Sequence, residues 1–307
     1  MLVQATRLAK DSTRRLLVSL GLFPYARRAR EWLCSIPYRH RTKFIIRLDG
    51  RDVCLVTTDT HSKVWCYRRN ESRQGDLHEP AIVKELARRV GNAKAFADVG
   101  GHLGYYSCIA GVLNPHLKVF CFEMNQRLIP AIRANFQANQ MRNAIVVSSP
   151  VADKRKLVSY SRASVSSDEP IHTEGDCKQK SRSRIYTETI TLDDFFSAQE
   201  TVPDIIKIDV EGAEMEVLQG AATLIKNHRP VLFLELHPKE IAAFNSSIIE
   251  IVDYLEYYRY SLYMPAYFRW DGKIKAVDRK RLLSLDRSDM VICVPEGQPP
   301  PASSFAA

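Results

Sequence analysis

Residues 95–104 read AFADVGGHLG, and this short stretch decides the fold. It begins as an apolar run of strand length and ends in three glycines at a turn from strand to helix: Gly100, Gly101 and Gly104. Glycines let a ligand approach the backbone closely, beside the N–H groups that a helix start leaves without partners. Asp98 stands before the glycines, where its carboxylate repels a pyrophosphate but attracts an amino group. The glycine pattern is G-G-x-x-G, whereas dinucleotide sites have G-x-G-x-x-G. The position of Asp98 and this spacing both disfavour a dinucleotide site.

Short apolar runs alternate with helical patterns on both sides of this stretch. The expected strands, rich in Val, Ile or Phe, are residues 95–99, 119–123, 144–148, 205–209 and 231–236. Apolar residues at helical spacing occupy residues 80–90, 128–136, 215–224 and 248–255. The alternation predicts an α/β, doubly wound fold with a mainly parallel sheet between two helical layers. Ahead of it, residues 43–58 alternate around Asp49-Gly50, which predicts a β-hairpin.

Charged residues gather at the carboxyl ends of two expected strands. In the run DIIKIDVEGAE (residues 204–214), Lys207 and Asp209 share one face of an otherwise apolar strand. This arrangement is costly unless the two serve each other or a ligand, and Glu211 adds a further charge. The following strand ends in Glu235-Leu236-His237, where a histidine could act as general base and Glu235 could orient it. A site at this edge and a purely structural ion-pair cluster are the two interpretations.

Glu123 ends the strand that follows the glycine loop. In doubly wound folds an acidic residue about 20 residues past such a loop accepts hydrogen bonds from both ribose hydroxyls of a nucleoside. We therefore expect Glu123 to bind ribose, with an ordinary exposed carboxylate as the alternative.

The composition, with 45% hydrophobic and 26% charged residues, is that of a globular protein, and no apolar stretch reaches the length of a membrane span. The seven cysteines are scattered, which argues against a disulfide framework or structural zinc and favours a cytoplasmic, reducing compartment. The formal net charge is +9, yet residues 1–43 hold ten basic and two acidic groups. This basic segment, with the apolar run Leu16–Phe23, has three open interpretations: a helix covering the domain, a targeting segment, or a contact with an anionic membrane.

Taken in order, these motifs resemble the FkbM family of S-adenosylmethionine-dependent methyltransferases. The resemblance covers residues 78–265, is most specific in the run KIDVEGAE (residues 207–214), and includes the segment Thr191-Leu192-Asp193-Asp194. It implies a class I methyltransferase (Rossmann-like) sheet of seven strands. The N-terminal helix and hairpin extension, expected from the sequence pattern, lies outside the resemblance. In the first motif the family usually has D-x-G-A-N, and Gly101-His102 departs from it conservatively.

The resemblance also implies roles for individual residues. The residues assigned to cofactor binding are Asp98, Gly100, Gly101, His102, Gly104, Glu123 and Met124. The residues assigned to catalysis are Asp209, Glu211, His237 and Lys207. The expected reaction is methylation of a hydroxyl on a sugar, glycan, lipid-linked compound or secondary metabolite, with a base removing the hydroxyl proton.

Other functions fit the residues less well. Base methylation of nucleic acid uses a D/N-P-P-Y/F motif, and the chain has Asp209-Val210-Glu211-Gly212 instead, so a nucleic-acid partner is not expected. An RNA or other nucleic-acid methyltransferase, and a noncatalytic cofactor-binding module of the same fold, stay the alternatives. Asp209, Glu211, Glu235 and His237 offer ligands for a divalent ion, but no spacing is diagnostic and no metal is assigned. The expected organisation is an extension over residues 1–77, a methyltransferase domain over residues 78–294 with a polar loop at 162–184, and a disordered tail over residues 295–307.

Overall fold

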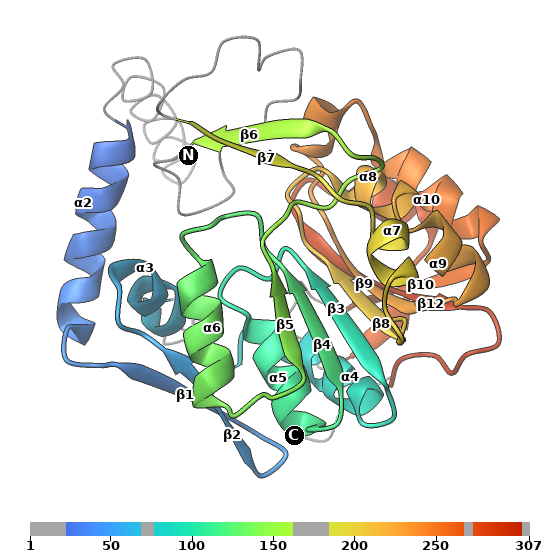
Figure 1. Cartoon of the computed structure of the whole chain (residues 1–307). Coiled ribbons are helices and arrows are strands. Elements are labelled where there is room, and N and C mark those ends of the chain that lie inside the picture. Colours follow the sequence, from blue (N-terminus) through green and yellow to red (C-terminus); the bar gives the residue numbers. More distant parts are fainter. Residues whose placement is uncertain (1–22, 69–76, 162–183, 267–272, 303–307) are drawn as a thin grey trace.

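The computed structural model describes residues 23–68, 77–161, 184–266 and 273–302 (Figure 1). Its central sheet is built from eight strands: β3 (Ala95–Val99), β4 (Lys118–Phe122), β5 (Ala144–Val147), β8 (Ile205–Ile208), β9 (Val231–Leu236), β10 (Tyr260–Pro265), β11 (Ile274–Ala276) and β12 (Asp289–Pro295). Their order is β11-β10-β12-β9-β8-β3-β4-β5. The five strands from β9 to β5 are parallel, and β12, β10 and β11 form an antiparallel edge. The predicted α/β fold with a mainly parallel core is confirmed.

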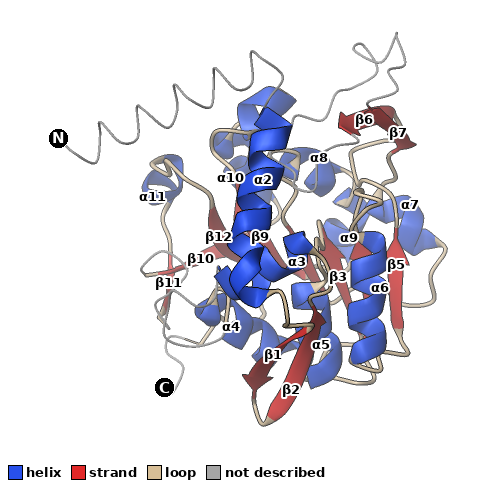
Figure 2. Ribbon diagram, turned by 90° about the vertical axis from the view of Figure 1, so that its left-hand side faces the viewer, coloured by secondary structure: helices blue, strands red, loops and turns tan. Residues whose placement is uncertain are grey.

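Helices cover both faces of this sheet (Figures 1 and 2). One face carries α4 (Pro80–Val90), α5 (Tyr105–Leu113), α6 (Ile129–Ala138) and the hairpin β1 (Lys43–Leu48) and β2 (Arg51–Val56). The other carries α7 (Leu192–Ser197), α8 (Glu214–Gln219), α9 (Ala222–Asn227), α10 (Ile248–Tyr257) and α11 (Arg279–Leu283). Alternate strand residues supply the two apolar cores, so Phe233 packs in the first while Leu232 and Leu234 pack in the second. The layers are those of a doubly wound fold.

The strand order reverses direction at the centre of the sheet. From β3 the chain builds outward through β4 to β5, and it then returns to the other side of β3 with β8 and β9. Open α/β sheets bind ligands outside the carboxyl ends of the strands at this kind of reversal. The motifs after β3, β4, β8 and β9 therefore meet at one place.

The N-terminal extension packs onto the same domain. The hairpin lies on α5 and α6, and Val53 and Leu55 have no exposed surface. Asn135 of α6 and Asn139, which caps its C-terminal end, bind the backbone of β2: Val56 N donates to Asn135 Oδ1 at 2.6 Å, and Cys54 N donates to Asn139 Oδ1 at 2.8 Å. The hairpin edge is thus satisfied by two side chains in place of a third strand.

Shorter elements complete the described chain. They are α2 (Phe23–Ser35), the 3₁₀ turns η1 (Ile36–Tyr38) and η4 (Ile241–Phe244), α3 (Thr60–Lys63), the π-helical turn η2 (Val64–Arg68), and an antiparallel pair of strands, β6 (Leu157–Ser161) and β7 (Arg184–Glu188). In Figures 1 and 2, α2 lies at the outside of the molecule beside α3. No helix of the described residues is long and apolar enough to cross a membrane.

The structure differs from the sequence-based expectations in three places. The sheet has an eighth strand, β11, whose three residues extend the antiparallel edge beyond the seven expected. Two helices, α8 and α9, take the place of the single helix expected over 215–224. Between them, Gly220 lies so close to Ala152 that a Cβ on Gly220 would be 2.0 Å from the Ala152 carbonyl oxygen. Asp193 then accepts hydrogen bonds from the backbone N–H groups of Thr223 and Leu224, which start α9.

The third difference is at the C-terminal side. The sequence predicts a disordered tail from Pro295. Instead, β12 includes Pro295, and residues 296–302 lie along α4. Arg89 Nη2 donates to the Pro299 carbonyl at 3.1 Å, and Ala302 N donates to Glu85 at 3.2 Å. Buried Glu85 also pairs with Arg88 and Arg89, so charged groups of α4 hold a segment with few apolar contacts of its own. Most of the expected polar loop 162–184, and Leu16 to Leu22 of the apolar run, lie outside the described residues.

Candidate functional site

The glycine loop after β3 is shaped by its contact with the end of β8. Gly100 has φ +79, and a Cβ on it would lie 1.8 Å from the Asp209 carbonyl oxygen. A Cβ on Gly101 would lie 2.2 Å from the Cys121 Sγ atom. Both positions therefore require glycine for packing within the protein, before any ligand is considered. The contact between Gly100 and Asp209 joins the glycine loop to the motif DIIKIDVEGAE (residues 204–214).

The loop uses its own backbone donors to hold itself. Gly100 N and Gly101 N both donate to the Phe122 carbonyl, at 2.9 and 3.0 Å, and Gly104 N donates to the Gly101 carbonyl at 2.7 Å. His102, at φ +53, donates its N–H to Glu123 Oε2 at 2.8 Å. The loop thus presents a fixed backbone surface to a ligand, with these four N–H groups already engaged.

Glu123 lies directly beside this loop at the carboxyl end of β4. Its two oxygens accept from the backbone N–H groups of His102 and Asn125, the second at 2.7 Å. Burial raises the pKa of Glu123 to about 7, while the two N–H donors and Lys207 pull it down. Each oxygen keeps a lone pair for a further donor such as a ribose hydroxyl. Met124 is half-buried, and its carbonyl accepts from the Tyr160 hydroxyl at 2.8 Å.

Asp98 and Lys207 form a buried pair beneath the loop. Lys207 Nζ lies 3.5 Å from Asp98 Oδ1, 3.2 Å from Asp209 Oδ2 and 3.1 Å from the Gly100 carbonyl oxygen. Burial opposes its charge, but Asp209 and Asp98 outweigh burial and raise the pKa of Lys207. Asp98 has no exposed surface and accepts from the N–H and hydroxyl of Ser107 at the start of α5. This lysine therefore fixes the glycine loop against the end of β8.

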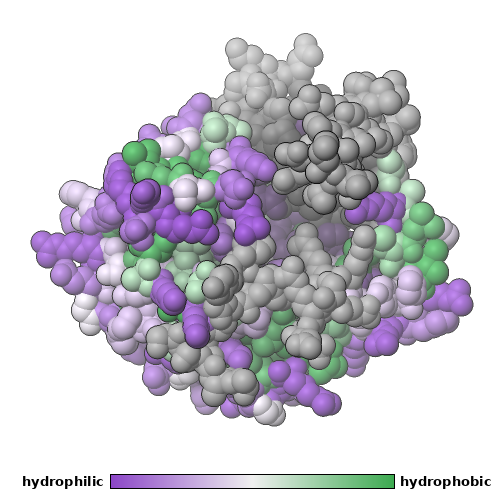
Figure 3. Space-filling model, turned by 180° about the vertical axis from the view of Figure 1, so that it is seen from behind, coloured by the Kyte–Doolittle hydropathy of each residue, from purple (hydrophilic) through white to green (hydrophobic). Residues whose placement is uncertain are grey.

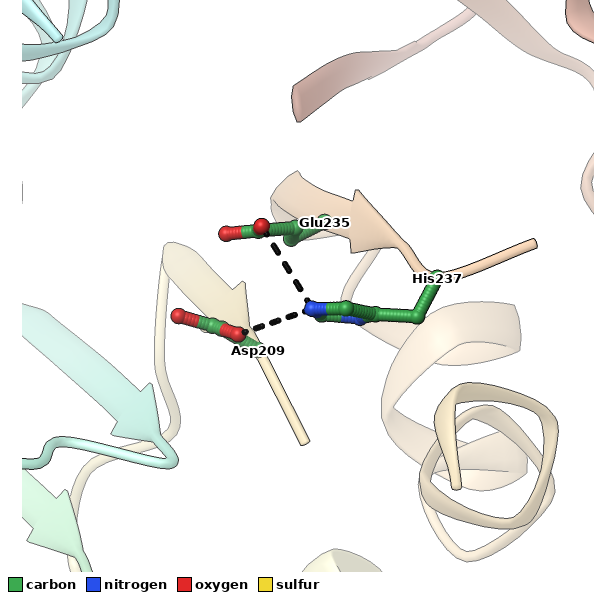
Figure 4. A group of neighbouring side chains, drawn as sticks. All are labelled: Asp209, Glu235 and His237. Carbon is green, nitrogen blue, oxygen red and sulfur yellow. Dashed lines mark ion pairs between the residues drawn. The ribbon is translucent and has the colours of Figure 1, made fainter. Parts of the chain in front are cut away.

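Asp209, Glu235 and His237 converge at the carboxyl ends of β8 and β9 (Figure 4). His237 Nε2 lies 3.6 Å from Asp209 Oδ1 and 3.4 Å from Glu235 Oε1. On its other side, His237 Nδ1 lies 2.6 Å from Glu214 Oε1. Glu214, from the first turn of α8, is completely buried and so orients the imidazole, a role that the sequence analysis gave to Glu235.

His237 is positively charged at neutral pH in this arrangement. Burial lowers its pKa, but its contacts with Glu214 and Glu235 and the charge of Asp209 outweigh burial and raise the pKa to about 11. A general base must be unprotonated at the working pH. With these partners His237 acts as a cation, and the carboxylates beside it are the groups that can accept a proton.

Three groups that contact the predicted site residues were not assigned from the sequence: Glu214 beside His237, and His61 and Trp65 beside His102. Glu214 was within the quoted motif, and its signal was a second acidic residue at the start of the following helix. His61 and Trp65 come from the N-terminal extension, for which no motif was available. His61 Nε2 lies 2.7 Å from His102 Nε2, and the Trp65 ring lies 5.7 Å from that of His102. Glu211, by contrast, is a predicted residue; it is half-buried and has φ +51 at the turn into α8.

The chain is similar to known methyltransferases. Residues 98–262 match the model of the methyltransferase FkbM domain. A curated relative, the hexuronic acid methyltransferase AglP of Haloferax volcanii, is 24% identical over 221 residues, which cover 70% of this chain and 84% of the relative.

Two solved structures are also similar. The crystal structure of a methyltransferase FkbM from Methylobacillus flagellatus KT is 15% identical with a TM-score of 0.44, and the alignment covers 66% of this chain but only 43% of that one. The precorrin-6y C5,15-methyltransferase of Geobacter metallireducens GS-15 is 13% identical with a TM-score of 0.41, over 71% of this chain and 87% of that one.

Proposed function

This chain belongs to the methyltransferase FkbM family, and from that premise we propose that it transfers a methyl group from S-adenosylmethionine to a carbohydrate hydroxyl. The sequence-based prediction of a methyltransferase is confirmed by the family match; the cofactor residues, the acceptor and the catalytic roles are our proposal. The observation that carries it is the packing of Gly100 against Asp209, which sets a nucleoside-type loop beside a cluster of carboxylates.

The residues at the carboxyl end of β4 fit this cofactor. Glu123 is held by two backbone N–H groups with lone pairs to spare, which suits two ribose hydroxyls. The loop with Gly100, Gly101, His102 and Gly104 offers a close backbone surface to the methionine part, and Met124 lies next to Glu123. Asp98 is too buried for us to assign it a direct contact, so we give it the role of holding Lys207. When bound, the cofactor supplies an electrophilic methyl group on a sulfonium.

The cluster at β8 and β9 supplies the groups that the acceptor needs. In the transfer, the acceptor oxygen bonds to the methyl carbon while the carbon–sulfur bond breaks and its electron pair returns to sulfur. The hydroxyl proton must go to a nearby base, and we assign Asp209, whose side chain is 30% exposed while that of Glu235 is 9% exposed. Lys207 and His237 position this carboxylate, and Glu211 lies at the same edge.

The acceptor class is inferred from the relative. Because AglP is named as a hexuronic acid methyltransferase, we propose a sugar acid, or a glycan that contains one, as the acceptor. The test is transfer of radiolabelled methyl to uronic-acid-containing oligosaccharides and to matched neutral sugars. Labelled sugar with wild-type protein, and none with Asp209→Asn, is the expected result. Cofactor binding without transfer to either group of sugars would leave a noncatalytic binding module.

We also propose that residues 1–43 contact an anionic membrane surface. In the described part of this segment, Trp32 and Leu33 of α2 are 60% and 59% exposed, beside a strongly basic sequence. Seen from behind, the hydrophobic residues of the surface form separate patches among hydrophilic ones (Figure 3). Each Lys or Arg near such a surface contributes about 1 kcal/mol.

Vesicle co-sedimentation checks this contact. The full chain should pellet with phosphatidylserine vesicles at low salt and be released at high salt, because the attraction is screened. Trp32→Ala should weaken binding at both salt concentrations, and Trp65→Ala serves as the control. Equal pelleting with neutral vesicles would contradict the proposal.

A further inference from the structure

Asp209, Glu235 and His237 bring three ligand atoms to one point. Each side chain offers one ligand atom, and the three atoms lie within 4.8 Å of one another. In Figure 4 the two carboxylates point from neighbouring strand ends toward the same nitrogen of the imidazole. One nitrogen and two oxygens form a donor set typical of divalent transition-metal ions, since Mg²⁺ and Ca²⁺ prefer oxygen alone.

The distances from His237 Nε2 to the two carboxylates are also those expected between ligand atoms of one ion. His237 Nε2 lies 3.4 Å from Glu235 Oε1 and 3.6 Å from Asp209 Oδ1. A charge-assisted hydrogen bond is about 2.7 to 2.9 Å long. Ligand atoms about 2.0 to 2.2 Å from a tetrahedral ion are about 3.3 to 3.6 Å apart. Both distances from His237 Nε2 fall in or at the edge of this range, and all three ligand atoms lie within 4.8 Å of one another.

A second observation is the position of Glu214. Its Oε1 lies 2.6 Å from His237 Nδ1, so Nδ1 keeps its proton and Nε2 faces the two carboxylates. An ion bound there would replace the proton that Nε2 carries in the metal-free protein. Glu214 is completely buried, and its Oε2 has no hydrogen-bond partner among the described residues. A carboxylate that fixes the distal nitrogen of a histidine is the usual outer-shell partner of a metal-binding imidazole.

The charges around this point also call for a cation. Four carboxylates, those of Asp98, Asp209, Glu214 and Glu235, contact two cationic side chains, Lys207 and protonated His237. Lys207 neutralises part of this charge through Asp98 Oδ1 and Asp209 Oδ2, which leaves Asp209 Oδ1 directed at His237. Buried negative charge in such excess is unfavourable unless a positive group accompanies it.

We propose that Asp209, Glu235 and His237 bind a divalent transition-metal ion, with Glu214 as positioning residue. Three protein ligands leave coordination positions open, as catalytic metal sites do. Two neighbouring oxygens of an acceptor fit those positions, so the site selects sugars with adjacent hydroxyls or a hydroxyl beside a carboxylate. This substrate role rests on the proposed function; the binding of the ion does not. The ion adds no covalent step to the transfer and fixes the acceptor oxygen opposite the cofactor loop.

The test titrates the metal-free full chain with Mn²⁺ in the absence of cofactor and acceptor, followed by calorimetry and by electron paramagnetic resonance of free Mn²⁺. One ion should bind per chain with a dissociation constant below about 100 µM, the range of moderately tight protein sites with few ligands. Glu235→Gln should weaken binding at least tenfold, and Glu214→Gln should weaken it 10- to 100-fold. Glu240→Gln removes an exposed charge near the same edge and should change nothing.

Thermal melting checks that each variant is folded, and Zn²⁺ titration repeats the comparison with a second ion. The proposal is overturned if the wild-type chain binds neither ion, or if Glu235→Gln and Glu240→Gln bind equally well. In that case the three side chains form an ion-paired cluster around a protonated histidine. Full activity after chelation, with Mn²⁺ binding intact, would remove the substrate role alone and leave the proposed methyl transfer standing.

Discussion

The two halves of the site, the glycine loop with Glu123 and the cluster of Asp209, Glu235 and His237, are held by different kinds of interaction. Around Glu123 and the glycine loop, backbone groups do most of the bonding, and glycines are required because the chain packs against itself. Around Asp209, Glu235 and His237, side-chain charges balance one another. A backbone-built half tolerates few substitutions, since its shape depends on the chain path. A half built from side chains can be altered residue by residue, and acceptor choice can change there while cofactor binding persists.

The largest expected effect separates chemistry from cofactor binding. Asp209→Asn keeps the size of the side chain and an acceptor for Lys207, but it removes the carboxylate that takes the proton. Turnover should fall by about 10² to 10⁴, the contribution of a general base, while cofactor affinity and melting temperature stay near wild type. Steady-state kinetics, cofactor calorimetry and a thermal melt measure the three quantities. A variant that is fully active, or one that unfolds, would show that Asp209 only supports the structure.

The next effect tests the opposite half. Glu123→Ala removes the carboxylate that we assign to the ribose hydroxyls, and cofactor affinity should weaken by about 2 to 3 kcal/mol, the value of hydrogen bonds to a charged acceptor. Calorimetric titration with S-adenosylmethionine and its demethylated product gives the difference. Glu188→Ala, on the surface strand β7, is the matched control. Unchanged affinity in Glu123→Ala would exclude the ribose role.

A smaller effect concerns the contact between Gly100 and Asp209, where the two halves of the site meet. Gly100→Ala places a Cβ 1.8 Å from the Asp209 carbonyl oxygen and puts a side chain on a left-handed residue. The chain should lose about 1 to 3 kcal/mol of stability, as overpacked positions do, and both cofactor affinity and turnover should fall together. Gly297→Ala, also left-handed but with open space around it, separates backbone strain from the clash. Equal losses in the two variants would mean that the contact with Asp209 does not matter.

The last effect is a pH dependence of cofactor binding. In the free protein, burial raises the pKa of Glu123 to about 7, so the carboxyl is largely protonated at pH 6 and ionised at pH 8. Ribose hydroxyls bind the ionised form, so affinity should rise with pH, at most tenfold per unit below about 7, and then level off. Glu123→Gln should remove this rise. If wild type and variant show the same profile, another group is responsible.

The sequence predicted the first half of the site better than the second. The glycines and Glu123 follow from spacing along neighbouring strands, because parallel strands bring their carboxyl ends to one edge. The orientation of His237 did not follow, because Glu214 reaches it from α8 and the alternation of a strand says nothing about a neighbouring helix. His61 and Trp65 were missed since they belong to no motif, and only the fold of the extension brings them to His102. The contacts of Arg89 with the Pro299 carbonyl were likewise invisible in a polar, proline-rich tail.

The hairpin β1–β2 lies outside the residues that match the family model but inside the folded core. The family match begins at residue 98, yet Val53 and Leu55 lie in the same apolar core as α4, α5 and the sheet. Cutting the chain at residue 78 would uncover α5 and α6 and remove the β2 backbone groups that Asn135 and Asn139 bind. The residues that match the family model are therefore fewer than the residues that pack into one core. A fragment of this chain that keeps the core intact therefore has to include the hairpin.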